Sequence, residues 1–403
     1  MRSTRKSARV GPLTAHPGPT RPFDLDALLA DRGLRIVVCC GSGGVGKTTT
    51  SAAIALRAAE QGREVVVLTI DPARRLAQSM GIEALDNTPR PVKGVGGDGD
   101  GRLDGMMLDM KRTFDEVVES QASPEKAKQI LSNPFYIAVS SSFAGTQEYM
   151  AMEKLGQLDK DARRTGRWDL IVVDTPPSRS ALDFLDAPER LSSFLDGRFI
   201  RLLTAPARGP ARMMTAGFGM VTNAVTKIIG AQVLRDMQAF VAAFDTLFGG
   251  FRQRAQKTFE LLQARGTAFV VVAAPEPDAL REAAYFVERL SEEHMPLAGL
   301  VVNRAHRLPA GGLSGEHAAS AAESLLENGT TDEADRLTAG LLRLHADRAR
   351  IVAREHHLRQ RFAAAHPAVP TAEVPALSTD VHDLDGLRLV GRLLAGEDQA
   401  VTA

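Results

Sequence analysis

The sequence predicts an α/β protein with a doubly wound, mostly parallel sheet and an inserted helical subdomain. Three observations support this fold. Short apolar runs rich in β-branched residues alternate with longer segments of helical spacing. A glycine-rich loop separates the first apolar run from the first such helix. The runs end at polar or proline-containing turns, and ligands of open parallel sheets bind at those carboxyl ends.

The first strands and helix form a βαβ unit. The run LRIVVCC, residues 34–40, is apolar, β-branched in the middle and ended by Gly41. The alanine-rich segment after the glycine loop has helical spacing and stops at Gly62. EVVVLTID, residues 64–71, is a second buried run, so the unit is right-handed with parallel strands. Similar runs predict strands that end at Asp109 and Asp174, and strands within 267–280 and 297–304.

Other segments interrupt or extend this alternation. Residues 111–162 and 186–262 have helical character without a convincing strand, and they form the predicted helical subdomain. The stretch 305–333 is rich in Gly, Ser and Ala, which predicts a mobile connection. A long amphipathic helix is then predicted over about residues 334–365.

The bulk composition is that of a soluble globular protein. Lys plus Arg and Asp plus Glu number 49 each among 403 residues, so no global field attracts nucleic acid or anionic lipid. Residues 1–22 are basic and rich in Pro, Gly, Ser and Thr, which predicts a disordered tail ahead of a folded domain over 23–403. The tail lacks the apolar centre of a secretory signal, and no run approaches 18 apolar residues. The adjacent Cys39 and Cys40 cannot build a disulfide framework or a spaced metal site, which favours a cytoplasmic location.

The strongest functional signal is GSGGVGKT, residues 41–48. It matches G-x-x-x-x-G-K-[ST] at every fixed position and lies between a strand and a helix. Glycines let successive backbone N–H groups converge on phosphate oxygens, and the helix N-terminus adds partial positive charge. Lys47 should bind the β- and γ-phosphates of ATP and assist catalysis, and the Thr48 hydroxyl should ligate Mg²⁺. The residues expected to hold the nucleotide are Gly43, Gly44, Val45, Gly46, Lys47, Thr48 and Thr49.

Three carboxylates end predicted strands and are candidates for the same site. Asp174 ends IVVD and is expected in the Mg²⁺ shell beside Thr48, through a water molecule. Asp71 ends VVVLTID and could polarise the attacking water, although it could also cap the following helix. For Asp109 the capping and functional interpretations are equally favoured.

Two further features have a functional and a plain structural interpretation. Asn303, after the late run LVV, offers both a donor and an acceptor to an adenine edge, although asparagines are common in loops. The segment 212–234 is rich in Met, Val and Ile, which suits a surface that accommodates varied apolar partners. Taken alone, such a segment is more often ordinary core.

These motifs resemble those of the ArsA/Get-type ATPases of the SIMIBI class, over nearly the whole folded chain. The glycine loop is similar to their deviant Walker A motif. The other matching segments are IDPARRLA (70–77, switch I), DTPPSRSALDFL (174–185, switch II), VVNR (301–304, adenine side) and VPALSTDVHDLDGL (374–387, C-terminal adenine loop). The last match adds Pro375 to the expected adenine site.

The resemblance implies more than the motifs do. It implies a cytoplasmic, dimeric, Mg²⁺-dependent ATPase whose helices respond to nucleotide state, paired with itself or with a second ArsA/Get-type subunit. It also implies that Asp71 orients the hydrolytic water. In relatives the place of segment 212–234 is taken by helices that bind a protein client, which can be membrane-destined.

Departures from the family pattern refine these expectations. Neither the separated cysteines of arsenite handling nor a CxxC zinc site is present, which argues against an arsenite pump subunit. Ser42 stands where the family carries a lysine that crosses the dimer to the partner's phosphates. In this feature the chain resembles the serine-loop member of the paired BagA and BagB group. A cation that acts in trans can contribute about 10³–10⁵ in rate, so ATP hydrolysis by this chain without a second, lysine-bearing subunit should be weak. The cation could come from a second, lysine-bearing subunit, or from Arg74 or Arg75.

Three functions are compatible with these residues. The first is an ATP-driven switch that binds and delivers a protein client, and the second is a regulatory, nearly inactive ATP-binding subunit of an ATPase pair. The third is a DNA- or membrane-positioning ATPase. LDGLRLVGRLLAG, residues 384–396, leaves peripheral membrane contact open, although its overlap with the final family helix favours packing. Nucleic acid is not an expected partner, because the chain lacks a net basic charge.

Overall fold

A computed structural model shows how the predicted elements assemble. It describes residues 21–403 except for the ranges 71–74, 83–84, 97–100, 135, 138–139, 141–145, 177–252, 309–311, 328–331 and 398–403. The expected tail 1–22 lies almost wholly outside the described residues, as does most of the expected helical segment 186–262. The client-binding interpretation of segment 212–234 therefore stays a prediction.

The core of the protein is an eight-stranded sheet with the order β3-β4-β2-β5-β1-β6-β7-β8. All neighbouring strands in it are parallel except the antiparallel pair β3 and β4. The strands are β1 Ile36–Cys40, β2 Glu64–Thr69, β3 Arg90–Pro91, β4 Arg102–Met107, β5 Leu170–Asp174, β6 Thr267–Ala273, β7 Leu297–Ala305 and β8 Thr371–Pro375. The six strands expected from apolar runs are all present, which confirms the doubly wound α/β fold.

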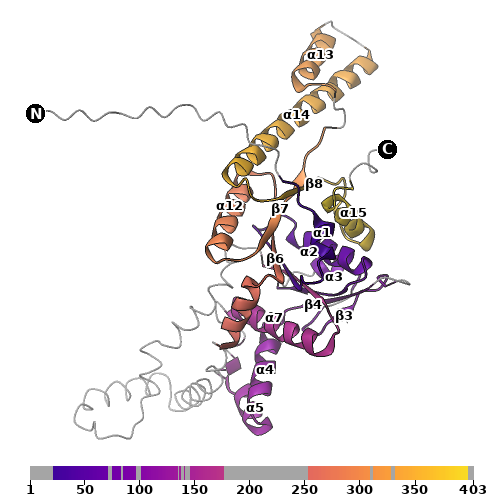
Figure 1. The fold of residues 1–403 in the computed structure, drawn as a ribbon. Coiled ribbons are helices and arrows are strands. Elements are labelled where there is room, and N and C mark those ends of the chain that lie inside the picture. Colours follow the sequence, from indigo (N-terminus) through magenta and orange to yellow (C-terminus); the bar gives the residue numbers. More distant parts are fainter. Residues whose placement is uncertain are drawn as a thin grey trace, which may run out of the picture.

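Helices cover both faces of this sheet (Figure 1). Side chains alternate along a strand, so Ile36 and Val38 of β1 join one buried cluster, whereas Val37 and Cys39 join the other. The first cluster includes residues of α4 Met110–Gln121, α5 Pro124–Leu131, α7 Thr146–Thr165, α12 Pro277–Glu292 and the C-terminal part of α14 Glu333–Ala365. The second includes residues of α1 Leu25–Ala30, α2 Lys47–Glu60, α3 Arg75–Ser79 and α15 Leu384–Leu394. A further helix covers 253–263.

The amphipathic helix near the C-terminus packs on the sheet. Four side chains of α15 are almost fully buried, Leu387, Val390, Leu393 and Leu394, and they lie in the same cluster as α2. The expectation that segment 384–396 packs within the fold is confirmed. Among the described helices, none combines the length and apolar character needed to cross a bilayer.

The stretch 305–333 differs from the expected connection. It contains helix α13, Gly315–Glu327, which lies against α14, the next described helix along the chain. Alanine is the best helix former, and Ala318 and Ala322 are completely buried against α14. The small residues that suggested an irregular connection are therefore the packing surface of a helical hairpin.

Candidate functional site

The glycine loop connects β1 to α2 at the carboxyl edge of the sheet. Gly46 has φ +94°, and a Cβ built on it would lie 2.1 Å from the Asn303 amide nitrogen. A Cβ on Gly41 would lie 2.1 Å from the carbonyl oxygen of Val272 in β6. The loop path thus requires glycine at its first and last positions, as the phosphate-binding motif predicts.

The described residues of the motif occupy the loop and the first turn of α2. Gly43 and Gly44 are exposed, Val45 is buried, and Gly46, Thr48 and Thr49 are partly buried. Lys47 begins α2 and is 6% exposed; its ammonium donates a hydrogen bond of 2.8 Å to the Ser42 carbonyl oxygen. The lysine therefore folds back over its own loop, which places its charge among the loop amides and at the start of α2.

Asp174 lies beside the loop, where the sequence placed it. The strand register aligns Asp174 at the end of β5 with Cys39 of β1 and Thr69 of β2. One oxygen of its carboxylate, Oδ2, accepts hydrogen bonds from Thr48 Oγ1 at 2.8 Å and from Thr69 Oγ1 at 2.9 Å. The residue is completely buried.

This donor set fits Mg²⁺. Magnesium takes hard oxygen ligands, commonly one hydroxyl or carboxylate of the protein with water and phosphate oxygens. Thr48 supplies a hydroxyl and Asp174 a carboxylate, already in contact with each other. Among the described residues no cluster of three His, Cys, Asp or Glu side chains could hold a metal ion.

Strand β7 supports the loop from the opposite side. The Asn303 amide nitrogen donates to the Val45 carbonyl oxygen at 2.8 Å, and Arg304 Nη1 donates to the Gly44 carbonyl oxygen at 3.1 Å. Arg304 adopts φ +60°, an uncommon backbone conformation for a residue other than glycine. Asn303 thus lies at the phosphate loop in the structure, and its expected contact with adenine stays a prediction.

Pro375 ends β8 and is paired in register with Ala305 of β7. The next residue, Ala376, donates its N–H to the Ala305 carbonyl oxygen at 2.9 Å. Residues 375–383 and α15 line a cavity of about 590 Å³, together with Arg307. Asn303 and Pro375 therefore lie at the carboxyl ends of the adjacent strands β7 and β8, and their expected contacts with adenine stay a prediction.

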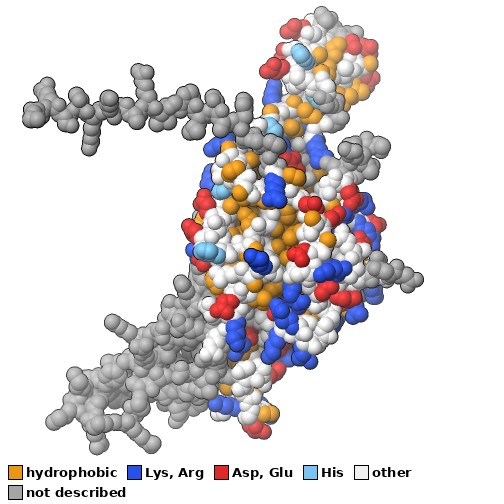
Figure 2. Space-filling model, viewed as in Figure 1, with side chains coloured by type: hydrophobic (Ala, Val, Ile, Leu, Met, Phe, Trp, Pro, Cys, Tyr) orange, Lys and Arg blue, Asp and Glu red, His pale blue; other side chains and the backbone are white. Residues whose placement is uncertain are grey.

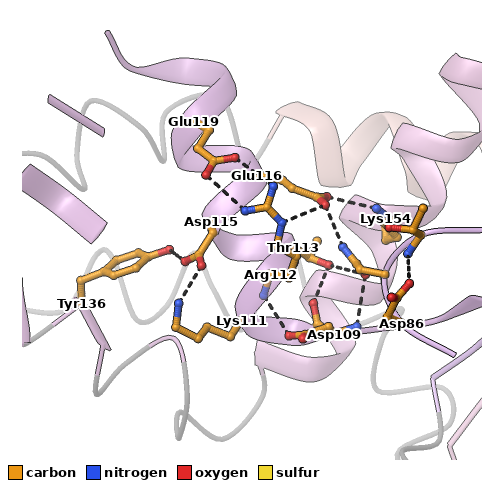
Figure 3. Close-up of polar contacts among 12 residues, drawn as sticks. Asp86, Asp109, Lys111, Arg112, Thr113, Asp115, Glu116, Glu119, Tyr136 and Lys154 are labelled. Atoms are coloured by element: carbon orange, nitrogen blue, oxygen red, sulfur yellow. Dashed lines mark hydrogen bonds and ion pairs between the residues drawn. The ribbon is translucent and has the colours of Figure 1, made fainter. Parts of the chain in front are cut away.

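Of the other two strand-terminal carboxylates, the structure describes only Asp109. Asp71 lies outside the described residues, as does Arg74, so the water-orienting role stays a prediction. Asp109 is the N-cap of α4, and its carboxylate accepts the Arg112 N–H at 2.9 Å. Figure 3 shows Asp109 at the start of α4, in a network of hydrogen bonds and ion pairs that reaches Glu116 and Lys154. The capping interpretation of Asp109 is the one that the contacts support.

Cys39 and Cys40 are buried free thiols in β1. Burial raises the pKa of the Cys40 thiol to about 12. Burial, with the nearby Asp174 carboxylate as a smaller cause, also raises the pKa of the Cys39 thiol well above its ordinary value. Both are therefore protonated core residues at neutral pH.

Two contacts of this site could not be found from the local motifs. Thr69 shares the Asp174 carboxylate, and Arg304 holds the Gly44 carbonyl group. Each joins segments more than a hundred residues apart along the chain, and each depends on strand order. The one available signal was position, since both residues lie at the carboxyl ends of buried strands.

Comparison with known proteins agrees with this geometry. The sequence profile of the family described as anion-transporting ATPase matches residues 34–312, which include the glycine loop, Asp174 and Asn303. The chain belongs to the anion-transporting ATPase family. The family-level resemblance is thereby confirmed, and the narrower likeness to the paired serine-loop group stays a prediction.

Individual members of the anion-transporting ATPase family show the extent of the likeness. The chain is 26% identical to an ATPase ASNA1 homolog of Cryptosporidium parvum over 306 residues, 75% of each chain. It is 26% identical to ATPase GET3 of Podospora anserina over 285 residues, 70% of this chain and 76% of the relative. An arsenical pump-driving ATPase of Acidiphilium multivorum is 32% identical over 158 residues, 39% of this chain and 26% of the relative.

Proposed function

We propose that this chain is a cytoplasmic ATPase that acts as a nucleotide-controlled switch and works with a second ATPase subunit to bind or deliver a protein client. Membership of the family and the ATPase names of its relatives support ATPase activity in general. The observation that carries the proposal is the contact between Thr48 and the buried Asp174 beside the Lys47 loop.

The proposed reaction is hydrolysis of ATP to ADP and phosphate. The loop amides and the Lys47 ammonium bind the phosphates, and they counter the charge that develops on the phosphoryl oxygens. Thr48 and Asp174 hold Mg²⁺, which neutralises phosphate charge when it is bound. Asp71 orients the water that attacks the γ-phosphorus as the bond to the ADP oxygen breaks; this role comes from the family resemblance.

Ser42 is the reason for proposing a second subunit. The Ser42 carbonyl oxygen accepts a hydrogen bond from Lys47, and the short, uncharged side chain of Ser42 is only partly exposed. It cannot extend a cation across an interface, so a lysine from the second subunit is proposed to reach this subunit's nucleotide. Binding of ATP should survive the serine, because it uses the loop amides, Lys47 and Thr48.

Measuring turnover with and without a candidate subunit tests the proposal. Wild-type protein, Lys47→Ala and Ser42→Lys are compared for nucleotide affinity and for phosphate release. Lys47→Ala should lose both; Ser42→Lys should keep affinity and gain turnover at least about tenfold when the protein self-associates. An absence of nucleotide binding by wild-type protein at high concentration would refute the proposal.

The serine also favours a second function, that of a regulatory ATP-binding subunit with little activity of its own. In that case ATP bound to this chain would raise the turnover of the partner's site. The two functions are distinguished by blocking hydrolysis at the partner's own site. This is done by substituting the partner lysine that is equivalent to Lys47, while the lysine proposed to cross the interface is kept. Turnover that persists belongs to this chain, and turnover that vanishes while ATP remains bound here indicates regulation.

The client is tested separately from the nucleotide chemistry. Photo-crosslinking residues placed at several positions within 212–234 should capture the client from native cells when a non-hydrolysable ATP analogue is present. The same positions in a Lys47→Ala background provide the control, since they keep the segment and lose the nucleotide. Equal capture with and without nucleotide would contradict a switch.

A further inference from the structure

A helical hairpin projects from the body of the protein. It consists of α13 and the N-terminal part of α14, residues 312–354, and is called the arm below (Figure 1). The two helices are tied together where the arm begins, because His345 Nε2 lies 2.8 Å from the Leu313 carbonyl oxygen. Close packing continues beside it, since a Cβ on Gly315 would lie 2.8 Å from the Ala349 methyl group.

The arm buries its small side chains and exposes its large ones. Ala318 and Ala322 of α13 and Ala339 and Ala346 of α14 are 0–3% exposed. On α14, Leu337, Leu341 and Leu344 are 65%, 59% and 66% exposed. Figure 2 shows hydrophobic side chains gathered on the projecting arm. Three leucines exposed together on one helix are a surface that a monomeric protein rarely presents.

The exposed residues follow one line along α14. Leu337, Leu341, Leu344 and Ile351, with Arg348 between the last two, are spaced by four, three, four and three residues. This is the period of the contact line of a coiled coil, in which each apolar side chain inserts between residues of a facing helix. At 100° per residue the line lies on the side of α14 opposite the alanines that contact α13. We call these four apolar residues the leucine seam.

The charges along α14 are separated by sign. Its N-terminal end carries an excess of acid, Asp332, Glu333 and Asp335 with Arg336 beside them, and the following turns carry an excess of arginine, Arg343, Arg348, Arg350 and Arg354, with Asp347 among them. Two such helices in parallel would place like charges side by side along the seam. In an antiparallel pair the acidic end of one helix meets the basic turns of the other. A second copy of the same helix, running antiparallel, therefore complements this surface in charge.

We propose that two copies of this chain associate through their leucine seams as an antiparallel pair of α14 helices. A two-fold axis between Leu341 and Leu344 sets Leu341 against Leu344 of the second copy. Leu337 then packs on the aliphatic part of the opposite copy's Arg348 side chain, whose guanidinium donates to the Arg307 carbonyl oxygen of its own chain at 2.9 Å. Glu333 lies beside Arg354 of the opposite copy. This association needs no nucleotide and does not rest on the proposed function.

The contact is of modest size. From Glu333 to Arg354 the helix is about 32 Å long at 1.5 Å per residue. A single helix pair of that length, without other contacts, lies at the small end of specific interfaces. The dimer should therefore form and dissociate with concentration, with a dissociation constant on the order of micromolar.

Sedimentation velocity of the full-length chain without nucleotide, over a hundredfold range of concentration, tests the pairing. Wild type should shift from monomer to dimer. Replacing both Leu341 and Leu344 by Glu should raise the dissociation constant at least about a hundredfold, because four charges then face each other. The matched control is Tyr285→Glu on α12, which changes a side chain 53% exposed but outside the arm and should leave the dimer unchanged. Circular dichroism checks that α14 stays helical.

A charge exchange tests the antiparallel register. Glu333→Arg and Arg354→Glu should each weaken the dimer about threefold to tenfold, because each places like charges together at both ends. The double variant should recover the wild-type dissociation constant, since both partners are exchanged in the same chain. A wild-type chain that stays monomeric, a dimer insensitive to the leucine variants, or a double variant as weak as the singles would each overturn the proposal.

Discussion

Substitution of Gly46 by alanine separates the shape of the phosphate loop from its chemistry. Gly46 carries no reacting group, but its φ of +94° and its closeness to the Asn303 amide allow little room for a methyl group. A left-handed backbone costs a residue with a Cβ about 1–2 kcal/mol. Displacing Asn303 breaks its 2.8 Å hydrogen bond to Val45, which contributes about 1 kcal/mol. The two effects sum to about 2–3 kcal/mol.

This cost should fall on nucleotide binding rather than on the fold. The atom that the new methyl group meets is the end of a side chain, so the loop can shift and turn its amides away from the phosphates. At 1.4 kcal/mol for each factor of ten, MgADP affinity measured by calorimetry should fall about 30- to 150-fold. Gly41→Ala is the contrast, because its methyl group would meet the backbone of Val272 and should lower the free energy of unfolding instead.

The double variant Gly46→Ala, Asn303→Ala decides whether this reasoning holds. Removing the Asn303 amide removes the atom that the methyl group meets, and leaves the backbone cost. The loss of binding free energy in the double variant should therefore be smaller than the sum of the single losses, by about 1 kcal/mol. Strict additivity, or wild-type affinity in Gly46→Ala, would refute the geometry described for the loop.

Three further predictions address other parts of the molecule. The gain in nucleotide affinity on adding Mg²⁺ is measured by titrations with and without EDTA. Thr48→Val should reduce this gain at least about tenfold, whereas Thr48→Ser should keep it. Arg63 is 1% exposed and donates to the backbone carbonyl groups of Leu29 and Leu34. Arg63→Met should therefore lower the free energy of unfolding, measured with urea, by about 3–5 kcal/mol. The hydrogen bond from Arg57 lowers the pKa of Asp26, so this pair stabilises the fold above the unfolded-state pKa of about 4 and is lost as pH falls through the lower folded value. When the free energy of unfolding is measured as pH is lowered below about 4, it should fall less in Asp26→Asn than in wild type.

The strands that the sequence predicts are those buried on both faces. β1, β2, β5 and β6 read as continuous apolar runs because helices cover the sheet on both sides. β8, Thr371–Pro375, lies at the sheet edge, has an exposed glutamate at its centre and ends in proline, so its pattern does not differ from that of a loop. β3 has two residues, too few to show any period.

The site divides in the same way. The phosphate loop is a local motif, so its residues and their strand–helix context can be read from ten consecutive positions. The contact of Thr48 with Asp174 joins residues 126 positions apart, and it could be expected because β5 ends beside β1 in a doubly wound sheet. The direction of the Asn303 side chain could not be predicted from the sequence, because the same amide can bond an adenine edge or a loop carbonyl group equally well. The packing of β7 against the loop, and not the residue type, determines which of these two groups the Asn303 amide contacts.

The strand that holds the phosphate loop also holds the arm. At the end of β7, Asn303 and Arg304 bond the loop carbonyl groups, and the next turn presents His306 to Glu355 of α14. Glu355 is 4% exposed and accepts the His306 N–H at 2.9 Å, while its other oxygen lies 2.6 Å from the His306 ring. A displacement of the loop by a bound phosphate would therefore act on β7 only three residues from the anchor of the long helix. If the seams pair, the relative position of two phosphate loops becomes linked through two rigid helices, without contact between the loops themselves.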